Sequence, residues 1–282
     1  MYNGFYMAKK YCFAHGKIVP LSKFTISPYD LGILRGYGVF DFMITVNNKP
    51  FLWREHYKRL VHSGKELHLT VPLSEKKYGE VLSKLLRKNA FKKASIRTML
   101  TGGMSSNGFL QDGTPTFYIL MDRRSNLPKE YYQNGARVIT MKYGRHLPQA
   151  KVTNYVEAIR NNTLRQKKKA LEMLYVKDGK VLEASTSNFF LVKGKKIVTA
   201  KDDVLLGITR NIVMKLARKH FTVEERIIRE MELRTAEEAF LTASNKHVLP
   251  VVMIDGRKVG SGKVGEKTRI LMKLYNDFVK KY

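Results

Sequence analysis

The sequence predicts an α+β fold in two domains. Apolar runs of strand length and amphipathic segments of helix length are mixed in both halves of the chain. Between the halves, residues 122–133 carry charges, a proline and no clear period, which is typical of a linker. A chain of 282 residues can hold one or two such domains. We therefore expect a small N-terminal α/β domain over residues 1–121, this linker, and a larger C-terminal domain over residues 134–282.

The first half supplies strands and two helices. Residues 54–67 predict a helix, because Tyr57, Leu60 and Gly64 fall on one face at helical spacing. Ser74 is a typical N-cap residue and predicts the start of a second helix. Strands are expected near residue 18 and over residues 39–46, 95–101 and 116–121.

The second half predicts a second sheet with helices. A helix is expected over about residues 155–169, and Gly207 precedes another one. The pair Asp178-Gly179 predicts a hairpin turn. Strands are expected near residues 136–141, 188–192, 196–199, 240–244 and 251–254, before a helix at the C-terminus.

The charge of the chain is unusual. It has 52 basic and 24 acidic residues, which gives a net charge of +28 and would attract any polyanion. The lysines are spread along the whole chain, however, and there is no zinc-ligand spacing, aromatic-rich RNA-binding signature or basic-region heptad. We therefore interpret the charge as a solvated bias and expect neither a specific nucleic-acid partner nor a metal.

The single cysteine and the hydropathy of the chain favour a cytoplasmic setting. Cys12 has no partner for an intramolecular disulfide and is expected to be a small buried apolar residue. No apolar run approaches the length of a membrane span, and we expect no signal peptide and no membrane partner.

Four motifs in a fixed order carry the chemistry. The stretch 55–60 reads Glu-His-Tyr-Lys-Arg-Leu, and Lys151 begins Lys-Val-Thr-Asn-Tyr. About thirty residues later, Glu183 begins Glu-Ala-Ser-Thr-Ser-Asn-Phe-Phe, and Gly207-Ile-Thr-Arg then opens a helix. Together these motifs resemble the class IV aminotransferases, the fold type IV pyridoxal-phosphate enzymes. The resemblance implies a two-domain homodimer, with pyridoxal 5′-phosphate in the interdomain cleft and the active sites near the dimer interface.

The resemblance gives three residues direct roles on the cofactor ring. Lys151 would form a Schiff base with the cofactor aldehyde and move the proton at the substrate α-carbon. Glu183 would hold a proton on the pyridine nitrogen, so that the ring withdraws electrons. Tyr155 would bind the phenolic oxygen. The plainer alternatives are a surface glutamate at the end of a hairpin strand and a core tyrosine.

The resemblance assigns the cofactor phosphate to Arg59, Ile208, Thr209 and Ser244. Arg59 would make a bidentate contact. The backbone N–H groups of Ile208 and Thr209 would use the start of a helix, where the helix dipole favours an anion. We expect His56 to be a structural partner rather than a catalyst, because Lys151 already serves as the base.

The substrate is harder to predict. Familiar D-amino acid members of the family carry an Arg-x-His pair in the loop that is residues 101–108 here, but this loop has neither residue, and Phe40 replaces their tyrosine. The branched-chain pattern keeps its strand arginine as Arg97, but its expected tyrosine is Ser95 and its Phe-Glu-Gly-Ile-Arg stretch is only partly matched. Neither pattern is complete.

Two arginines remain to bind a carboxylate. Arg35 and Arg97 would clamp the α-carboxylate, and Phe40 and Asn245 complete the expected substrate contacts. This looks like a less common group of D-amino acid transaminases, with 2-oxoglutarate or pyruvate as acceptor. The alternatives are an L-branched-chain aminotransferase, an aminodeoxychorismate lyase and a nucleic-acid-binding protein, and Arg35 has the alternative of a surface or interface salt bridge.

Overall fold

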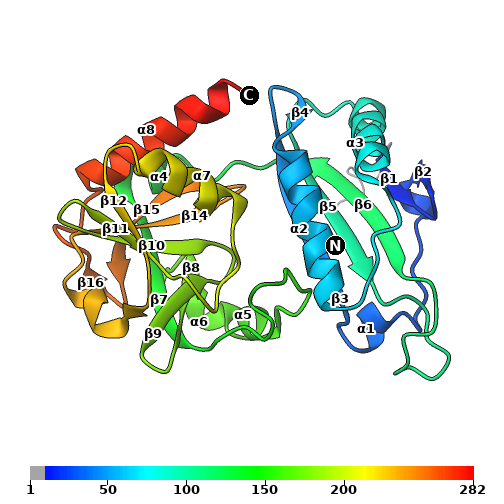
Figure 1. Ribbon diagram of the computed structural model, residues 1–282, viewed down its shortest axis with the longest axis horizontal. Helices are drawn as coiled ribbons and strands as arrows, with labels where there is room; N and C mark the ends of the chain where they lie inside the picture. Colours follow the sequence, from blue (N-terminus) through cyan, green and yellow to red (C-terminus); the bar gives the residue numbers. More distant parts are fainter. Residues whose placement is uncertain (1–9) are drawn as a thin grey trace. The chain divides into compact units, whose positions relative to one another are not determined.

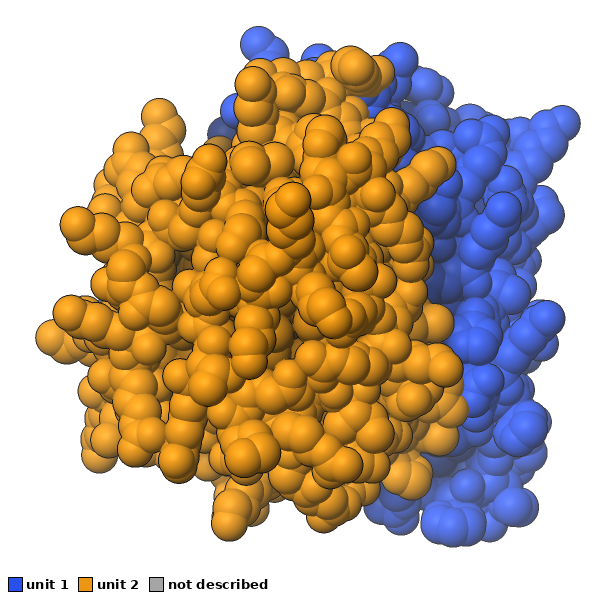
Figure 2. Space-filling model, turned by 60° about the vertical axis from the view of Figure 1, so that its left-hand side comes forward, with its two compact units in different colours: residues 1–125, 150–154, 282 blue, residues 126–149, 155–281 orange. Residues whose placement is uncertain are grey.

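The computed structural model describes residues 10–282, which form two compact units, coloured separately in Figure 2. The first unit runs as far as Ser125 and also includes Ala150–Asn154 and Tyr282. The second comprises Asn126–Gln149 and Tyr155–Lys281. Both units combine helices with a sheet, which confirms the predicted α+β class.

The first unit is built on an antiparallel sheet (Figure 1). Its elements are β1 (Tyr11–Ala14), β2 (Lys17–Pro20), η2 (Leu21–Lys23), α1 (Leu31–Leu34), β3 (Gly38–Val46), β4 (Lys49–Pro50), α2 (Trp53–Glu66), α3 (Glu75–Asn89), β5 (Ala94–Thr101) and β6 (Thr116–Arg123). The described strands follow the order β2-β1-β6-β5-β3-β4. Ser74 caps α3 as predicted, because its side chain accepts a hydrogen bond from the N–H of Lys77.

The alternation of side chains along β3 gives its two faces different tasks. Asp41 points to the face that α2 covers, where it meets His56. Thr98, directly opposite Asp41 in the register, accepts or donates a hydrogen bond with Tyr78 of α3. Phe40 lies on the opposite face of the strand because successive side chains alternate. The two helices therefore cover one face of this sheet.

A short segment from the middle of the chain pairs with the start of β3. Val152 forms an antiparallel bridge with Val39, and the N–H of Phe40 donates to the carbonyl of Lys151 at 2.9 Å. The N–H of Thr153 donates to the carbonyl of Gly38, also at 2.9 Å. These bonds place residues 150–154 in the first unit, although they lie within the predicted C-terminal domain range.

The second unit contains a larger sheet (Figure 1). Its elements are α4 (Glu130–Asn134), β7 (Ala136–Lys142), α5 (Val156–Arg160), α6 (Asn162–Lys167), β8 (Glu172–Lys177), β9 (Lys180–Ala184), β10 (Asn188–Lys193), β11 (Lys196–Thr199), α7 (Ile208–Ala217), β12 (Thr222–Glu225), β13 (Ile228–Arg229), η3 (Glu230–Arg234), β14 (Glu238–Ala243), β15 (His247–Ile254), β16 (Arg257–Lys258) and α8 (Glu266–Lys280). The described strands follow the order β12-β11-β10-β14-β15-β7-β8-β9-β13.

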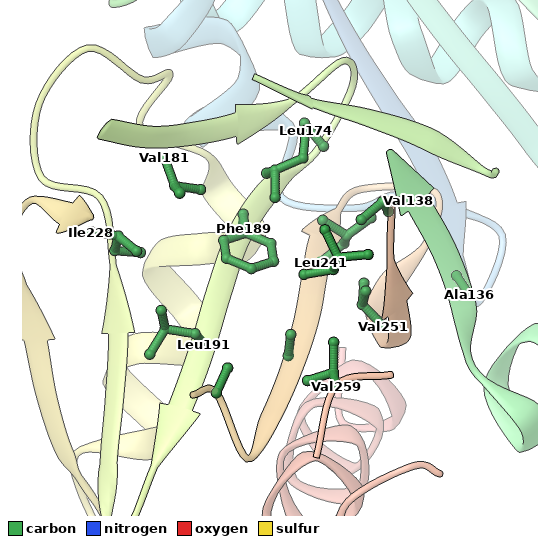
Figure 3. Packing of buried hydrophobic residues seen from close by; sticks show 14 of the residues in the cluster. Ala136, Val138, Leu174, Val181, Phe189, Leu191, Ile228, Leu241, Val251 and Val259 are labelled. Carbon is green, nitrogen blue, oxygen red and sulfur yellow. The ribbon is translucent and has the colours of Figure 1, made fainter. Parts of the chain in front are cut away.

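One extra pairing closes part of this sheet into a ring. Glu183 of β9 pairs with Asn188 of β10, so the path β10-β14-β15-β7-β8-β9 returns to its start. Phe189 lies inside, with Val181, Leu174 and Leu241 around its ring in Figure 3. The next residue, Phe190, packs instead with residues of α7 and α8. Because both faces of β10 are covered, its sequence is a continuous apolar run.

The predicted helix over residues 155–169 is divided in two. The structure has α5 and α6, with Asn161 between them at φ −91° and ψ 8°. The side-chain amide of Asn161 donates to the carbonyl of Glu157 at 2.9 Å. Asparagine competes in this way with the regular helix ladder, so the prediction of one continuous helix was wrong.

Candidate active site

Lys151 is held by its backbone beside β3. Its N–H donates to the hydroxyl of Ser63 at 3.0 Å, and its carbonyl accepts from Phe40. Its Nζ lies 4.6 Å from the centroid of the Phe40 ring. Lys151 also contributes to lowering the pKa of His56. The first unit therefore brings together Lys151, Phe40 and the α2 residues that were predicted to act near a cofactor.

A buried carboxylate orients the predicted phosphate-binding arginine. Asp41 is fully buried and accepts from Arg59 Nε at 2.8 Å and Arg59 Nη2 at 3.0 Å. Asp41 Oδ1 also lies 2.6 Å from Nδ1 of His56. Arg59 Nη1 makes no hydrogen bond within residues 10–282. This leaves one edge of the guanidinium group for an anion.

The electrostatics of this cluster leave Asp41 ionised and His56 neutral. Burial alone would raise the pKa of Asp41, but Arg59 and His56 outweigh it and hold that pKa well below its usual range. Burial lowers the pKa of His56 and outweighs the opposite effect of Asp41, while Arg59 and Lys151 lower it further. A neutral histidine that binds Asp41 supports the structural role expected for His56.

The two candidate substrate arginines are exposed and lie in the first unit. Nη1 of Arg35 donates to the carbonyl of Leu34 at 3.2 Å, and a Cβ added at Gly108 would lie 3.9 Å from its Nη2. Arg97 lies over the ring of Phe42, with Cζ 5.9 Å from the centroid. Within the described residues, neither arginine forms an ion pair and no hydrogen bond joins the two.

Glu183 is a buried carboxylate with fixed partners. It is 5% exposed, and its Oε1 accepts from Arg145 Nε at 2.7 Å. Its Oε2 accepts from the side-chain amide of Asn188 at 3.3 Å and from the N–H of Leu205 at 3.1 Å. A buried carboxylate beside an arginine keeps its charge, as a partner of a pyridinium nitrogen requires. A surface glutamate does not describe this environment.

Tyr155 and Glu183 share a neighbour. Tyr175 is buried, and its burial raises its pKa, as do Tyr143, Tyr155, Glu172 and Glu183 in smaller measure. The two predicted ring-binding residues of the second unit therefore lie within electrostatic reach of one buried phenol. Tyr155 itself stands just before α5 and is half-buried.

The start of α7 fits an anion. Gly207 is its N-cap, no side chain caps the helix, and no acidic residue lies in its first turn. The N–H groups of Ile208 and Thr209 therefore have no capping side chain. A Cβ on Gly207 would lie only 2.1 Å from Oδ1 of Asn188, so this close approach requires glycine. A helix start without a cap is a ready site for a phosphate.

Ser244 and Asn245 occupy the turn between β14 and β15. Ser244 is half-buried and Asn245 is exposed. The next residue, Lys246, is buried and bonds to Glu172 and to the turn that follows Glu183. The turn itself closes with a hydrogen bond from the N–H of Lys246 to the carbonyl of Ala243 at 3.2 Å.

Several residues of these clusters were missed from the sequence, namely Asp41, Arg145, Glu172, Asn188 and Lys246. Each contacts a predicted site residue or its segment through a partner distant in sequence, which single-sequence periodicity does not detect. A buried-strand position occupied by an aspartate was the one available signal for Asp41, because charged residues are rarely buried without a partner.

Within residues 10–282, no group of three His, Cys, Asp or Glu side chains is placed to hold a metal ion. No helix in the same part of the chain is long and apolar enough to cross a membrane. The donor set instead comprises a lysine, an oriented arginine, a buried glutamate and an uncapped helix start. These are the groups needed for an aldehyde, a phosphate and a pyridine nitrogen, so they fit pyridoxal 5′-phosphate.

Known proteins agree with this donor set. The family described as Amino-transferase class IV matches residues 38–254. The chain is 30% identical over 266 residues to the branched-chain-amino-acid aminotransferase of Pseudomonas aeruginosa, covering 89% of this chain and 85% of the relative. It is also 30% identical over 263 residues to the D-alanine aminotransferase of Listeria monocytogenes, covering 90% of each.

Solved structures agree on the fold. A branched-chain amino acid aminotransferase from the source abbreviated T.th., with pyridoxamine 5′-phosphate, has a TM-score of 0.89 and 26% identity, over 98% of this chain and 95% of that one. This likeness confirms the predicted fold type. The chain belongs to the class IV aminotransferases, a family of pyridoxal-phosphate enzymes.

Proposed function

We propose that this chain transfers the amino group of a D-amino acid to a 2-oxo acid such as 2-oxoglutarate or pyruvate. The observation that carries the substrate choice is the pair Arg35 and Arg97, both exposed and without an ion-pair partner among the described residues. The loop of residues 101–108 offers no arginine or histidine. Two guanidinium groups in one unit are then the natural cations for an α-carboxylate.

When bound, pyridoxal phosphate supplies an aldehyde carbon for the amino group and a protonated ring that withdraws electrons. Lys151 holds the aldehyde covalently through Nζ and, once displaced by the substrate amine, carries a proton from the substrate α-carbon to the former aldehyde carbon. Glu183 keeps the proton on the pyridine nitrogen, and Arg145 keeps Glu183 ionised. Tyr155 donates to the phenolic oxygen.

Phosphate binding by Arg59 gives a separate test. Arg59→Ala should weaken pyridoxal-phosphate binding by about 1–3 kcal/mol, the range for losing a charge-assisted hydrogen bond. Absorbance titration of the apoprotein measures this. Arg54→Ala is the matched control, because Arg54 lies on the same helix in an exposed pair with Glu75. Equal cofactor affinity in Arg59→Ala and wild type would remove Arg59 from the phosphate site.

The arginine pair predicts both the enantiomer and the kinetics of the variants. Both enantiomers of alanine, glutamate and leucine are assayed with 2-oxoglutarate, and we expect turnover of D-alanine or D-glutamate. Arg35→Ala and Arg97→Ala should each raise the KM of the D-amino acid about tenfold or more, as for a lost bidentate contact. Arg87→Ala, an exposed arginine of α3, should leave KM unchanged. Lost stability with an unchanged KM would make Arg35 structural.

An L-branched-chain aminotransferase is the second candidate. It is supported by the names of the Pseudomonas aeruginosa relative and of the T.th. structure. Robust turnover of L-leucine and L-isoleucine without activity on any D-amino acid would replace the D-amino acid proposal with this one.

A second copy of this chain is the partner we propose. The first unit exposes a set of apolar side chains from α1 and the loop after β5, namely Tyr29, Ile33, Leu34, Met104, Phe109 and Leu110. Their segments are joined, since the N–H of Ser105 donates to the carbonyl of Tyr29 at 3.2 Å. Contiguous exposed apolar surface is typical of an interface. Light scattering should give twice the chain mass of 32.5 kDa, and a monomer would contradict the proposal.

A further inference from the structure

A buried ion pair joins two turns of the second unit. We propose that Glu172 and Lys246 form a positioning pair, which fixes the turn carrying Ser244 and Asn245 against the turn that follows Glu183. This inference rests on the proposed function, because it concerns the placement of residues assigned there to the cofactor phosphate and the amino acid.

Glu172 is the anchor of the pair. It begins β8 and is 3% exposed. Its Oε2 accepts from the N–H of Thr186 at 2.7 Å, the hydroxyl of Thr186 at 3.0 Å and that of Ser185 at 3.2 Å. Its Oε1 accepts from the hydroxyl of Ser187 at 2.5 Å. One carboxylate therefore binds every residue of the turn between β9 and β10.

Lys246 connects the other turn to this anchor. Its Nζ lies 3.1 Å from Oε1 of Glu172 and donates to the hydroxyl of Thr186 at 2.8 Å. The side chain is only 11% exposed. Burial alone would raise the pKa of Glu172, but Lys246 and the donors of the turn outweigh it and hold that pKa below its ordinary value. Both members of the pair are thus charged and buried.

The pair stands next to residues of the site on both sides. Lys246 directly follows Asn245, so its tether limits the movement of the turn. On the other side, the anchored turn is flanked by Glu183 and Asn188, whose side chains bond to each other and whose pairing closes the ring of strands. A buried ion pair often adds little net stability compared with apolar replacements, so positioning is the role that explains it best.

A double variant separates positioning from stability. Lys246→Met leaves the Glu172 carboxylate buried without its cation, and Glu172→Gln leaves the Lys246 ammonium without its anion. Either single variant should lower the unfolding midpoint. The double variant Glu172→Gln/Lys246→Met removes both charges at similar volume and should recover most of that midpoint. The exposed pair Lys196 and Glu224, 2.7 Å apart in the same unit, gives the matched control with Lys196→Met and Glu224→Gln.

The measured quantities are the unfolding midpoint, the KM of the amino acid and the Kd of pyridoxal phosphate, on full-length protein. We expect KM and Kd to rise about tenfold or more in Lys246→Met and to stay raised in the double variant, because a small displacement of a binding group is costly. Control variants should stay within about twofold of wild type. Wild-type KM and Kd in the double variant, or in Lys246→Met, would overturn the positioning role. If wild type itself transfers no amino group, the proposed function fails and this inference fails with it.

Discussion

Lys151→Ala should reduce transamination by about 10³-fold or more. General-base catalysis alone contributes about 10²–10⁴-fold, and the covalent attachment of the cofactor is lost as well. The fold should survive, because the bonds that hold residue 151 to Ser63 and Phe40 use its backbone N–H and carbonyl. The near-visible absorbance of the cofactor-loaded protein should lose its lysine-linked band.

The matched control for this change is Lys65→Ala, an exposed lysine of α2 in the same unit. It should keep wild-type turnover and absorbance. Turnover in Lys151→Ala close to that of the control would mean that another amine carries the cofactor, and the roles given to Glu183 and Tyr155 would have to be reassigned with it.

Asp41→Asn should destabilise the first unit by about 3–5 kcal/mol, because it removes the anion from a buried pair and leaves Arg59 uncompensated. Urea unfolding followed by the fluorescence of Trp53, the chain's only tryptophan, reports on this unit. Asp122→Asn is the control, since Asp122 is 53% exposed in its pair with Lys10 and such pairs contribute about 0–1 kcal/mol. Equal losses in the two variants would contradict the buried-pair argument.

The same cluster predicts acid sensitivity. The pKa of Asp41 is lower in the folded than in the unfolded protein, so its contribution is present above about pH 3.9 and is lost as the pH falls further. His56 also has a lowered pKa, so its contribution begins to fall below about pH 6.5. The stability difference between wild type and Asp41→Asn should therefore shrink in acid. A difference that grows as the pH falls would reverse the assigned shift.

The secondary structure was largely predictable because it is local. The helix starting after Ser74, the hairpin at Asp178-Gly179 and the helix after Gly207 all form where cap and turn residues indicated. The helix over residues 155–169 failed because one asparagine side chain competes for a backbone carbonyl. That competition depends on geometry that periodicity alone does not contain.

The contacts between distant segments were beyond the sequence. Nothing local indicates that Lys151 pairs with β3, that Arg145 binds Glu183, or that Lys246 reaches Glu172. The motifs identified candidate residues by type and order, whereas their partners depend on tertiary packing. The partners are also what gives the candidates their charge state, as the shared carboxylate of Asp41 shows for Arg59 and His56.

The most direct test is to reduce the cofactor-loaded protein with borohydride and map the labelled peptide. Reduction fixes the bond between the cofactor and the amine that holds it, so mass spectrometry identifies that residue among the many lysines of the chain. We expect one phosphopyridoxyl group on Lys151 and an unlabelled Lys65. A label on another lysine, or protein that takes up no pyridoxal phosphate, would contradict the assignment of Lys151 as the residue that holds the cofactor.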